Sequence, residues 1–116
     1  AREGASRPFV EKMLASMGIA QQASAKTVLA AGSGAATESV ANGSVDIVLT
    51  LISEIVGVKG VDLVGPLPKE HQDYIRFSGA LAPKAPAKAK AALAILTSGD
   101  SAAVYKSKGM ESSTSR

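Results

Sequence analysis

Short runs of strand-like composition alternate along this chain with segments in which apolar residues recur at helical spacing. The clearest of these runs spans residues 45–50, which are apolar and rich in β-branched side chains apart from Asp46. Shorter runs of the same kind lie at residues 27–31, 61–64 and 74–81. Strands that alternate with helices are typical of an α/β fold in which at least some strands pair in parallel. We therefore expect an α/β chain.

Segments of helical spacing fill most of the sequence between these runs. In residues 7–17, Pro8 suits the first turn of a helix, and Gly18 supplies the left-handed residue at which helices often stop. The apolar residues of this segment form one stripe: Phe9, Val10, Met13, Leu14 and Met17. The same reasoning predicts helices over residues 19–25, 35–42, 87–96 and 101–106, and it leaves residues 51–56 open.

The composition limits both the core and the chemistry. With 116 residues, two Tyr, two Phe and no Trp, the chain has room for one modest core built from Val, Ile, Leu and Met. The absence of Cys excludes disulfides, thiolate zinc sites and cysteine nucleophiles. No apolar run approaches the roughly 20 residues of a membrane-spanning helix, so we expect no membrane insertion. We expect no cofactor and no bound metal, because the spaced carboxylates fall on different elements without a histidine partner.

Two predicted helix starts are candidate anion sites. Gly32-Ser33-Gly34 lies between a strand-like run and a helix, where backbone N–H groups and the positive end of the helix dipole favour an anion. Ser6 opens the first helix in a similar way and adds a hydroxyl. Each place also has a simpler interpretation, a tight turn at the glycines and a helix cap at Ser6. A dinucleotide site is not indicated, because Thr37 stands at the third glycine position.

One alternative function is hydrolysis at His71, the only histidine of the chain. A catalytic arrangement could be composed from Ser53, His71 and Asp73. The sequence has no nucleophile elbow of the Gly-x-Ser-x-Gly type to support it. We expect the chain not to be an enzyme.

A second alternative is a small basic nucleic-acid-binding module. The net charge is +3, and Lys84, Lys88 and Lys90 lie close together in an Ala- and Pro-rich stretch. No aromatic or arginine residues are interleaved with these lysines. The lysines equally fit the solvent-exposed face of an amphipathic helix, so we expect no nucleic-acid partner.

Several stretches, taken in order, carry a family resemblance. They are residues 32–43 (GSGAATESVANG), 45–50 with 52–55 (VDIVLT and ISEI), 60–68 (GVDLVGPLP) followed by Tyr74, and 91–98 with 102–110. Together they resemble the C-terminal half of a bacterial extracellular solute-binding protein, of the molybdate-binding-like class that serves ABC transporters. The resemblance runs from about Ala5 to Met110.

The resemblance implies a type II periplasmic-binding fold, in which two three-layer αβα lobes close on a ligand. It assigns residues 1–50 to the C-terminal part of lobe two and residues 51–60 to the hinge crossing. Residues 61–111 would be the C-terminal part of lobe one, and residues 112–116 a loose tail. The first strands of both lobes and the family's signal peptide would lie upstream, so the fold would be incomplete.

The resemblance also implies ligand contacts. Ser6 matches a family position that offers its backbone amide to an oxyanion, and the helix start at Gly34 and Ala35 matches another. Where molybdate binders have a tyrosine after a strand of lobe two, this chain has Leu49, which carries no donor. The implied ligand is therefore an oxyanion of another kind or a small organic anion.

The implied function is that of a non-enzymatic solute-binding component of an ABC importer, located in the periplasm or outside the cell. Its partners would be a small anionic ligand and an ABC permease. We expect a fragment with little binding of its own, because half of a cleft supplies few donors. Surfaces that the other half would cover stay exposed, so we expect a homodimer or a domain-swapped oligomer.

Overall fold

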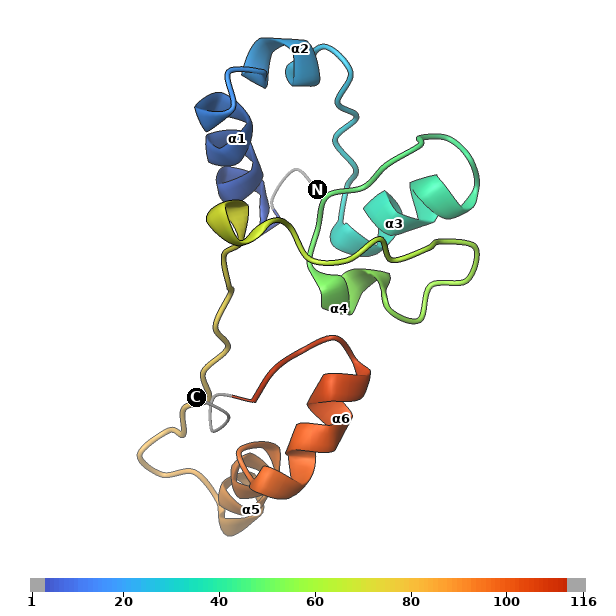
Figure 1. The fold of residues 1–116 in the computed structure, drawn as a ribbon. Helices are drawn as coiled ribbons and strands as arrows, with labels where there is room; N and C mark the ends of the chain where they lie inside the picture. Colours follow the sequence, from blue (N-terminus) through green and yellow to red (C-terminus); the bar gives the residue numbers. More distant parts are fainter. Residues whose placement is uncertain (1–3, 113–116) are drawn as a thin grey trace. The chain divides into compact units, whose positions relative to one another are not determined.

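A computed structural model describes residues 4–112 (Figure 1). The chain divides into two compact units, of which the first ends at Ile75 and the second begins at Arg76. Residues 113–116, which make up most of the predicted tail, lie outside the described residues.

The first unit begins with a helix whose two ends follow from its sequence. Helix α1 (Arg7–Ser16) has Pro8 in its first turn, where the missing N–H costs no helical hydrogen bond. It stops before Gly18, whose φ of 73° is the left-handed conformation that glycine adopts without strain. The helix predicted over residues 7–17 is thus confirmed to within one residue.

Three further α-helices and one 3-10 turn complete the first unit. They are α2 (Ala20–Ser24), α3 (Ser33–Ala41), α4 (Ile52–Ile55) and η1 (Lys69–His71). Helix α2 lies against α1, and α4 lies against α3. The predictions for α2 and α3 are confirmed, and the open segment at residues 51–56 forms one helical turn.

The second unit is a helical hairpin fastened by side-chain hydroxyls. It consists of α5 (Ala87–Leu96), η2 (Gly99–Ser101) and α6 (Ala102–Ser107). The last carbonyls of a helix have no donor within the helix. Here Ser101 Oγ donates to the Ile95 carbonyl at 2.6 Å, and the Tyr105 hydroxyl donates to the Leu96 carbonyl. These two bonds connect η2 and α6 to the end of α5.

The structure corrects the predicted fold class. None of residues 4–112 forms a strand or a sheet, so the α/β prediction and the three-layer αβα lobes of the type II periplasmic-binding fold are wrong. The runs at residues 27–31, 45–50, 61–64 and 74–81 are non-helical segments without backbone ladders. Their β-branched and aromatic side chains favour extended backbone, but a strand forms only where a second segment lies in register beside it. No described segment meets that condition.

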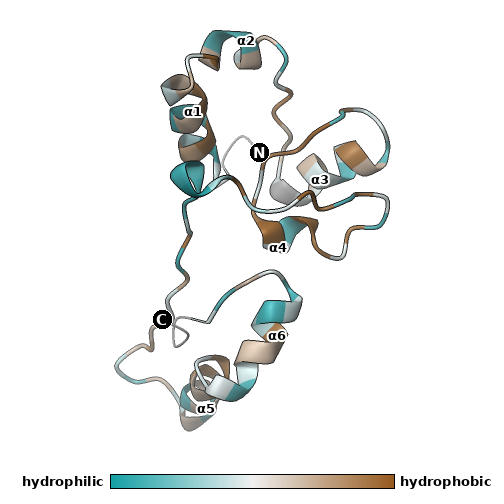
Figure 2. Cartoon of the chain, viewed as in Figure 1, coloured by the Kyte–Doolittle hydropathy of each residue, from teal (hydrophilic) through white to brown (hydrophobic). Residues whose placement is uncertain are grey.

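The core is correspondingly small. Among the described residues, Met13 is the one buried apolar side chain and Thr37 the one buried polar one. Figure 2 shows hydrophobic colouring along several segments outside the helices, and Val28, Ile47 and Phe77 are each more than 70% exposed. A sheet would have covered these side chains. Without a sheet, the backbone hydrogen bonds of the described residues lie within helices, at helix ends and in turns.

Candidate functional site

The start of α3 presents two free backbone amides. Gly32 precedes the helix in an extended conformation, and the first helical hydrogen bond runs from Ala36 N–H to the Gly32 carbonyl at 3.0 Å. The amides of Gly34 and Ala35 therefore have no acceptor in the helix, and no other acceptor lies within the described residues. Both residues are exposed. Such amides, at the positive end of a helix dipole, can donate to an anion.

Ser6 occupies the position before α1 but does not cap it with its side chain. Its carbonyl accepts from Val10 N–H at 3.0 Å, and its hydroxyl makes no capping hydrogen bond. The next residue, Arg7, pairs with Glu11 one turn along at 2.7 Å. The simpler interpretation of Ser6 as a side-chain cap therefore finds no support. Its half-buried hydroxyl has no partner among the described residues.

The two helix starts are separate in their hydrogen bonding. No hydrogen bond within the described residues connects Ser6 with Gly34 or Ala35. Leu49, at the position where a tyrosine was expected of molybdate binders, is 44% exposed in the segment before α4. Its aliphatic side chain has no hydrogen-bond donor.

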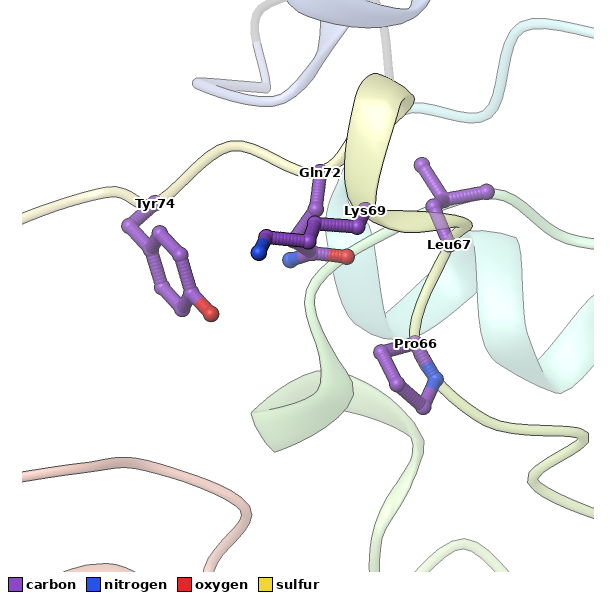
Figure 3. Close-up of a pocket in the computed structure, with 5 residues that line it drawn as sticks. All are labelled: Pro66, Leu67, Lys69, Gln72 and Tyr74. Atoms are coloured by element: carbon purple, nitrogen blue, oxygen red, sulfur yellow. The ribbon is translucent and has the colours of Figure 1, made fainter.

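A pocket lies elsewhere in the first unit, at the loop around η1 (Figure 3). Its volume is about 420 Å³, and its lining residues are Pro66, Leu67, Lys69, Gln72 and Tyr74. Figure 3 shows the ammonium of Lys69 and the amide of Gln72 side by side, with the ring of Tyr74 beside the same open space. Apolar walls with one cation suit a small anionic molecule that also has an apolar part.

In this pocket, only one of the two polar atoms of the Gln72 side-chain amide has a hydrogen-bond partner among the described residues. Its Nε2 donates to the Asp73 carbonyl at 3.0 Å, while its Oε1 is buried with no partner among the described residues. Pro66, Leu67 and Tyr74 belong to the stretches that carry the family resemblance, whereas Lys69 and Gln72 were not predicted as site residues. The signal that could have found them is the polar run that directly follows the Gly-Pro-Leu-Pro turn.

The catalytic arrangement considered for His71 is not assembled. His71 lies in η1, Ser53 lies in α4, and no hydrogen bond within the described chain joins either of them to the other or to Asp73. Asp73 Oδ1 instead accepts from the backbone N–H of Tyr74 at 2.8 Å. A base that does not contact its nucleophile or its orienting carboxylate gives no support to a hydrolase.

The three lysines of the basic stretch do not form a stripe. Lys88 and Lys90 are exposed on α5, and Lys84 is exposed in the turn before it. Residues two apart on a helix point in nearly opposite directions. The arrangement therefore gives no continuous basic surface on α5 for a nucleic-acid backbone.

The described residues also bear on metal binding and membrane insertion. Across residues 4–112, no group of three or more His, Cys, Asp or Glu residues is placed to hold a metal ion. In the same residues, every helix is too short or too polar to cross a bilayer.

The sequence also matches a known protein family. The chain fits the family described as bacterial extracellular solute-binding protein over residues 4–111. No curated protein and no solved structure matches it significantly. The family match spans nearly the whole sequence, and it covers both helix starts and the pocket. The chain therefore belongs to the family of bacterial extracellular solute-binding proteins.

Proposed function

We propose that this chain is the solute-binding component of a bacterial ABC importer and that its solute is a small anion. The family match over residues 4–111 carries the proposal, because members of this family bind solutes for transport rather than transform them. The family's extracellular setting supports a place in the periplasm or outside the cell, with an ABC permease as partner. The proposal also includes self-association. The division into a lobe-two part at residues 1–50, a hinge crossing at residues 51–60 and a lobe-one part at residues 61–111 stays a prediction.

The anionic character of the solute is supported by the donors that the first unit offers. The amides of Gly34 and Ala35 are exposed and free of helical partners. Ser6 adds an unused hydroxyl at the start of α1. The net charge of +3 favours the approach of anions in general. Since Leu49 brings no hydroxyl, the proposal names an oxyanion or a small organic anion and does not name molybdate.

The test is a titration of the isolated chain, followed through its backbone amide resonances. Sulfate, phosphate, molybdate and tungstate are added in turn, and we expect the resonances of Gly34 and Ala35 to move with millimolar dissociation constants. Weak binding is expected because a fragment supplies few of the donors that a complete binding protein offers. A micromolar dissociation constant would contradict the fragment interpretation. If none of these anions shifts the amide resonances of Gly34 and Ala35, these amides are not the anion site.

A pair of substitutions at Gly34 tests the amide itself. Gly34→Pro deletes one N–H that takes no part in the helix, so we expect anion binding to weaken about tenfold, as for a lost hydrogen bond to a charged group. Gly34→Ala keeps the N–H and has open space around its Cβ, so it is the matched control. Lys69→Met removes the ammonium group of the pocket around η1, so it tests whether the anion binds there instead. If only Lys69→Met weakens binding, the anion lies in that pocket and not at the start of α3.

A further inference from the structure

The pocket around η1 contains two neighbouring donor groups whose hydrogens are not all used. Figure 3 shows Nζ of Lys69 beside Nε2 of Gln72. Within the described residues, the Lys69 ammonium makes no hydrogen bond and no ion pair. Nε2 carries two hydrogens, of which one is donated to the Asp73 carbonyl at 3.0 Å. The second hydrogen has no acceptor in the same part of the chain. An acceptor for both groups must therefore come from water or from a ligand.

The hydrogen bond to Asp73 determines which end of the Gln72 amide lies beside Lys69. A backbone carbonyl only accepts, so the amide atom that bonds to it is the nitrogen. The amide oxygen, Oε1, points to the other side, toward Leu67 in Figure 3, where it is buried without a partner among the described residues. The end of the amide that lies next to the ammonium is therefore a donor as well. Two such donors side by side can bind one negatively charged group.

The charges around these donors favour a ligand with a single negative charge. Lys69 is the one charged side chain among the five that line the pocket. Glu70 and Asp73 do not line it, but each is next to a lining residue in the chain, and their carboxylates repel a second negative charge. A carboxylate brings one charge and two oxygens, which can accept from two adjacent donors. Dianions such as sulfate and molybdate are less suited to this pocket.

The other lining residues favour an apolar body on the same ligand. They are Pro66, Leu67 and Tyr74, and the ring of Tyr74 lies beside the open space in Figure 3. Tyr74 is 54% exposed, so its ring has apolar surface that a ligand can cover. The volume of about 420 Å³ lies within the range of about 300–1,000 Å³ that is typical of small-molecule sites. A bare inorganic anion would leave these walls in contact with water.

We propose that the pocket around η1 binds a monocarboxylate that has an aromatic or branched aliphatic body. Its carboxylate accepts from the Lys69 ammonium and from Nε2 of Gln72. Its body lies against Pro66, Leu67 and the ring of Tyr74. This inference names a class of solute, so it rests on the solute-binding role of the proposed function. It does not depend on an anion at the start of α3.

The start of α3 offers a different set of groups. Gly34 and Ala35 present backbone amides, and neither residue lines the pocket. Backbone amides at a helix start suit an inorganic oxyanion. Of the two places, the pocket is the one that combines donors with apolar walls. We therefore expect an inorganic oxyanion and an organic carboxylate to affect different residues of this chain.

A titration with 3-phenylpropionate, followed by magnetic resonance, tests the proposal on the chain as it is. We expect the side-chain amide resonances of Gln72 and the ring resonances of Tyr74 to move and to saturate. 3-Phenylpropanamide has the same body without the charge, and acetate has the charge without the body, so we expect each to bind about tenfold more weakly. Sulfate and molybdate should leave these resonances in place. The proposal is wrong if 3-phenylpropionate moves neither set of resonances, or if the neutral amide, acetate or either dianion binds as tightly.

Substitutions of the two donors test how the carboxylate is held. Lys69→Met removes the ammonium from an exposed side chain, and we expect 3-phenylpropionate to bind about tenfold more weakly. Gln72→Met removes Nε2 at a similar side-chain length, and we expect a several-fold loss. Lys59→Met is the matched control, because Lys59 is an exposed lysine of the same unit that does not line the pocket. Unchanged binding by Lys69→Met, or an equal loss in Lys59→Met, would overturn the proposal.

Failure of this proposal and failure of the anion site are distinguishable. The oxyanion titration is followed at the backbone amides of Gly34 and Ala35, whereas the 3-phenylpropionate titration is followed at the side chains of Gln72 and Tyr74. If only the oxyanion titration fails, the carboxylate site in the pocket stands. If only the 3-phenylpropionate titration fails, the inference about the pocket is wrong and the start of α3 stands as the anion site. Helical circular dichroism equal to that of the wild-type chain shows that each variant folds.

Discussion

Tyr105 provides the clearest single test of how the second unit is held together. Its hydroxyl donates to the carbonyl of Leu96, the last residue of α5. That carbonyl is one of those that a helix leaves without an internal donor. Tyr105→Phe removes the hydroxyl and keeps the half-buried ring. The variant therefore loses one hydrogen bond with little change in packing.

The expected magnitude follows from the surroundings of the bond. A net hydrogen bond between neutral groups contributes about 1 kcal/mol to stability. This bond is exposed, so water replaces the lost donor and the loss lies at about 0.5–1 kcal/mol. At room temperature this free energy corresponds to a roughly two- to fivefold larger population of the locally opened state.

Amide hydrogen exchange at the end of α5 measures that population. The N–H groups of Thr97 and Ser98 bond back into the last turn of α5, and we expect both to exchange about two to five times faster in Tyr105→Phe. Ser107→Ala is the matched control, because it removes a hydroxyl bonded to the Val104 carbonyl at 2.7 Å, within α6. Unchanged exchange in Tyr105→Phe would refute this account of the hairpin, as would an equal acceleration in Ser107→Ala.

Two further predictions concern the first unit. Met13 is 8% exposed, and Met13→Ala should cost about 2 kcal/mol in a urea unfolding experiment, against less than about 1 kcal/mol for Met17→Ala at a side chain that is 48% exposed. A smaller loss for Met13→Ala than for Met17→Ala would contradict the assigned core. Gly18 has a φ of 73° and open space around it, so Gly18→Ala should cost about 1 kcal/mol through backbone strain alone. Gly99→Ala is the control from the second unit: with ordinary backbone and open space around it, it should leave the melting temperature unchanged.

The helices could be predicted because their signals are local. Pro86 and Thr97 bound α5 in the sequence and in the structure, and Pro8 with Gly18 sets α1 to within one residue. The prediction of a sheet was wrong, because its signal was not sufficient. The composition of residues 45–50 favours extended backbone, but ladder partners are a property of the tertiary structure, and the described chain provides none.

Part of the candidate site could be predicted because it depends on local sequence signals. The free amides of Gly34 and Ala35 follow from where a helix starts, which the glycines in the sequence indicate. The pocket around η1 depends on how Lys69, Gln72 and Tyr74 meet after a proline-rich turn. Sequence spacing does not predict that these three side chains line one pocket, because the path of a loop brings them together.

The hydroxyl groups at the end of α5 have a consequence for the conditions in which the chain works. Salt weakens attraction between exposed ions, whereas bonds between neutral hydroxyls and carbonyls are little affected by it. Outside the cytoplasm, ionic strength follows that of the surrounding medium. We therefore expect a hairpin fastened by the hydroxyls of Ser101 and Tyr105 to keep its geometry over a wide range of salt concentrations.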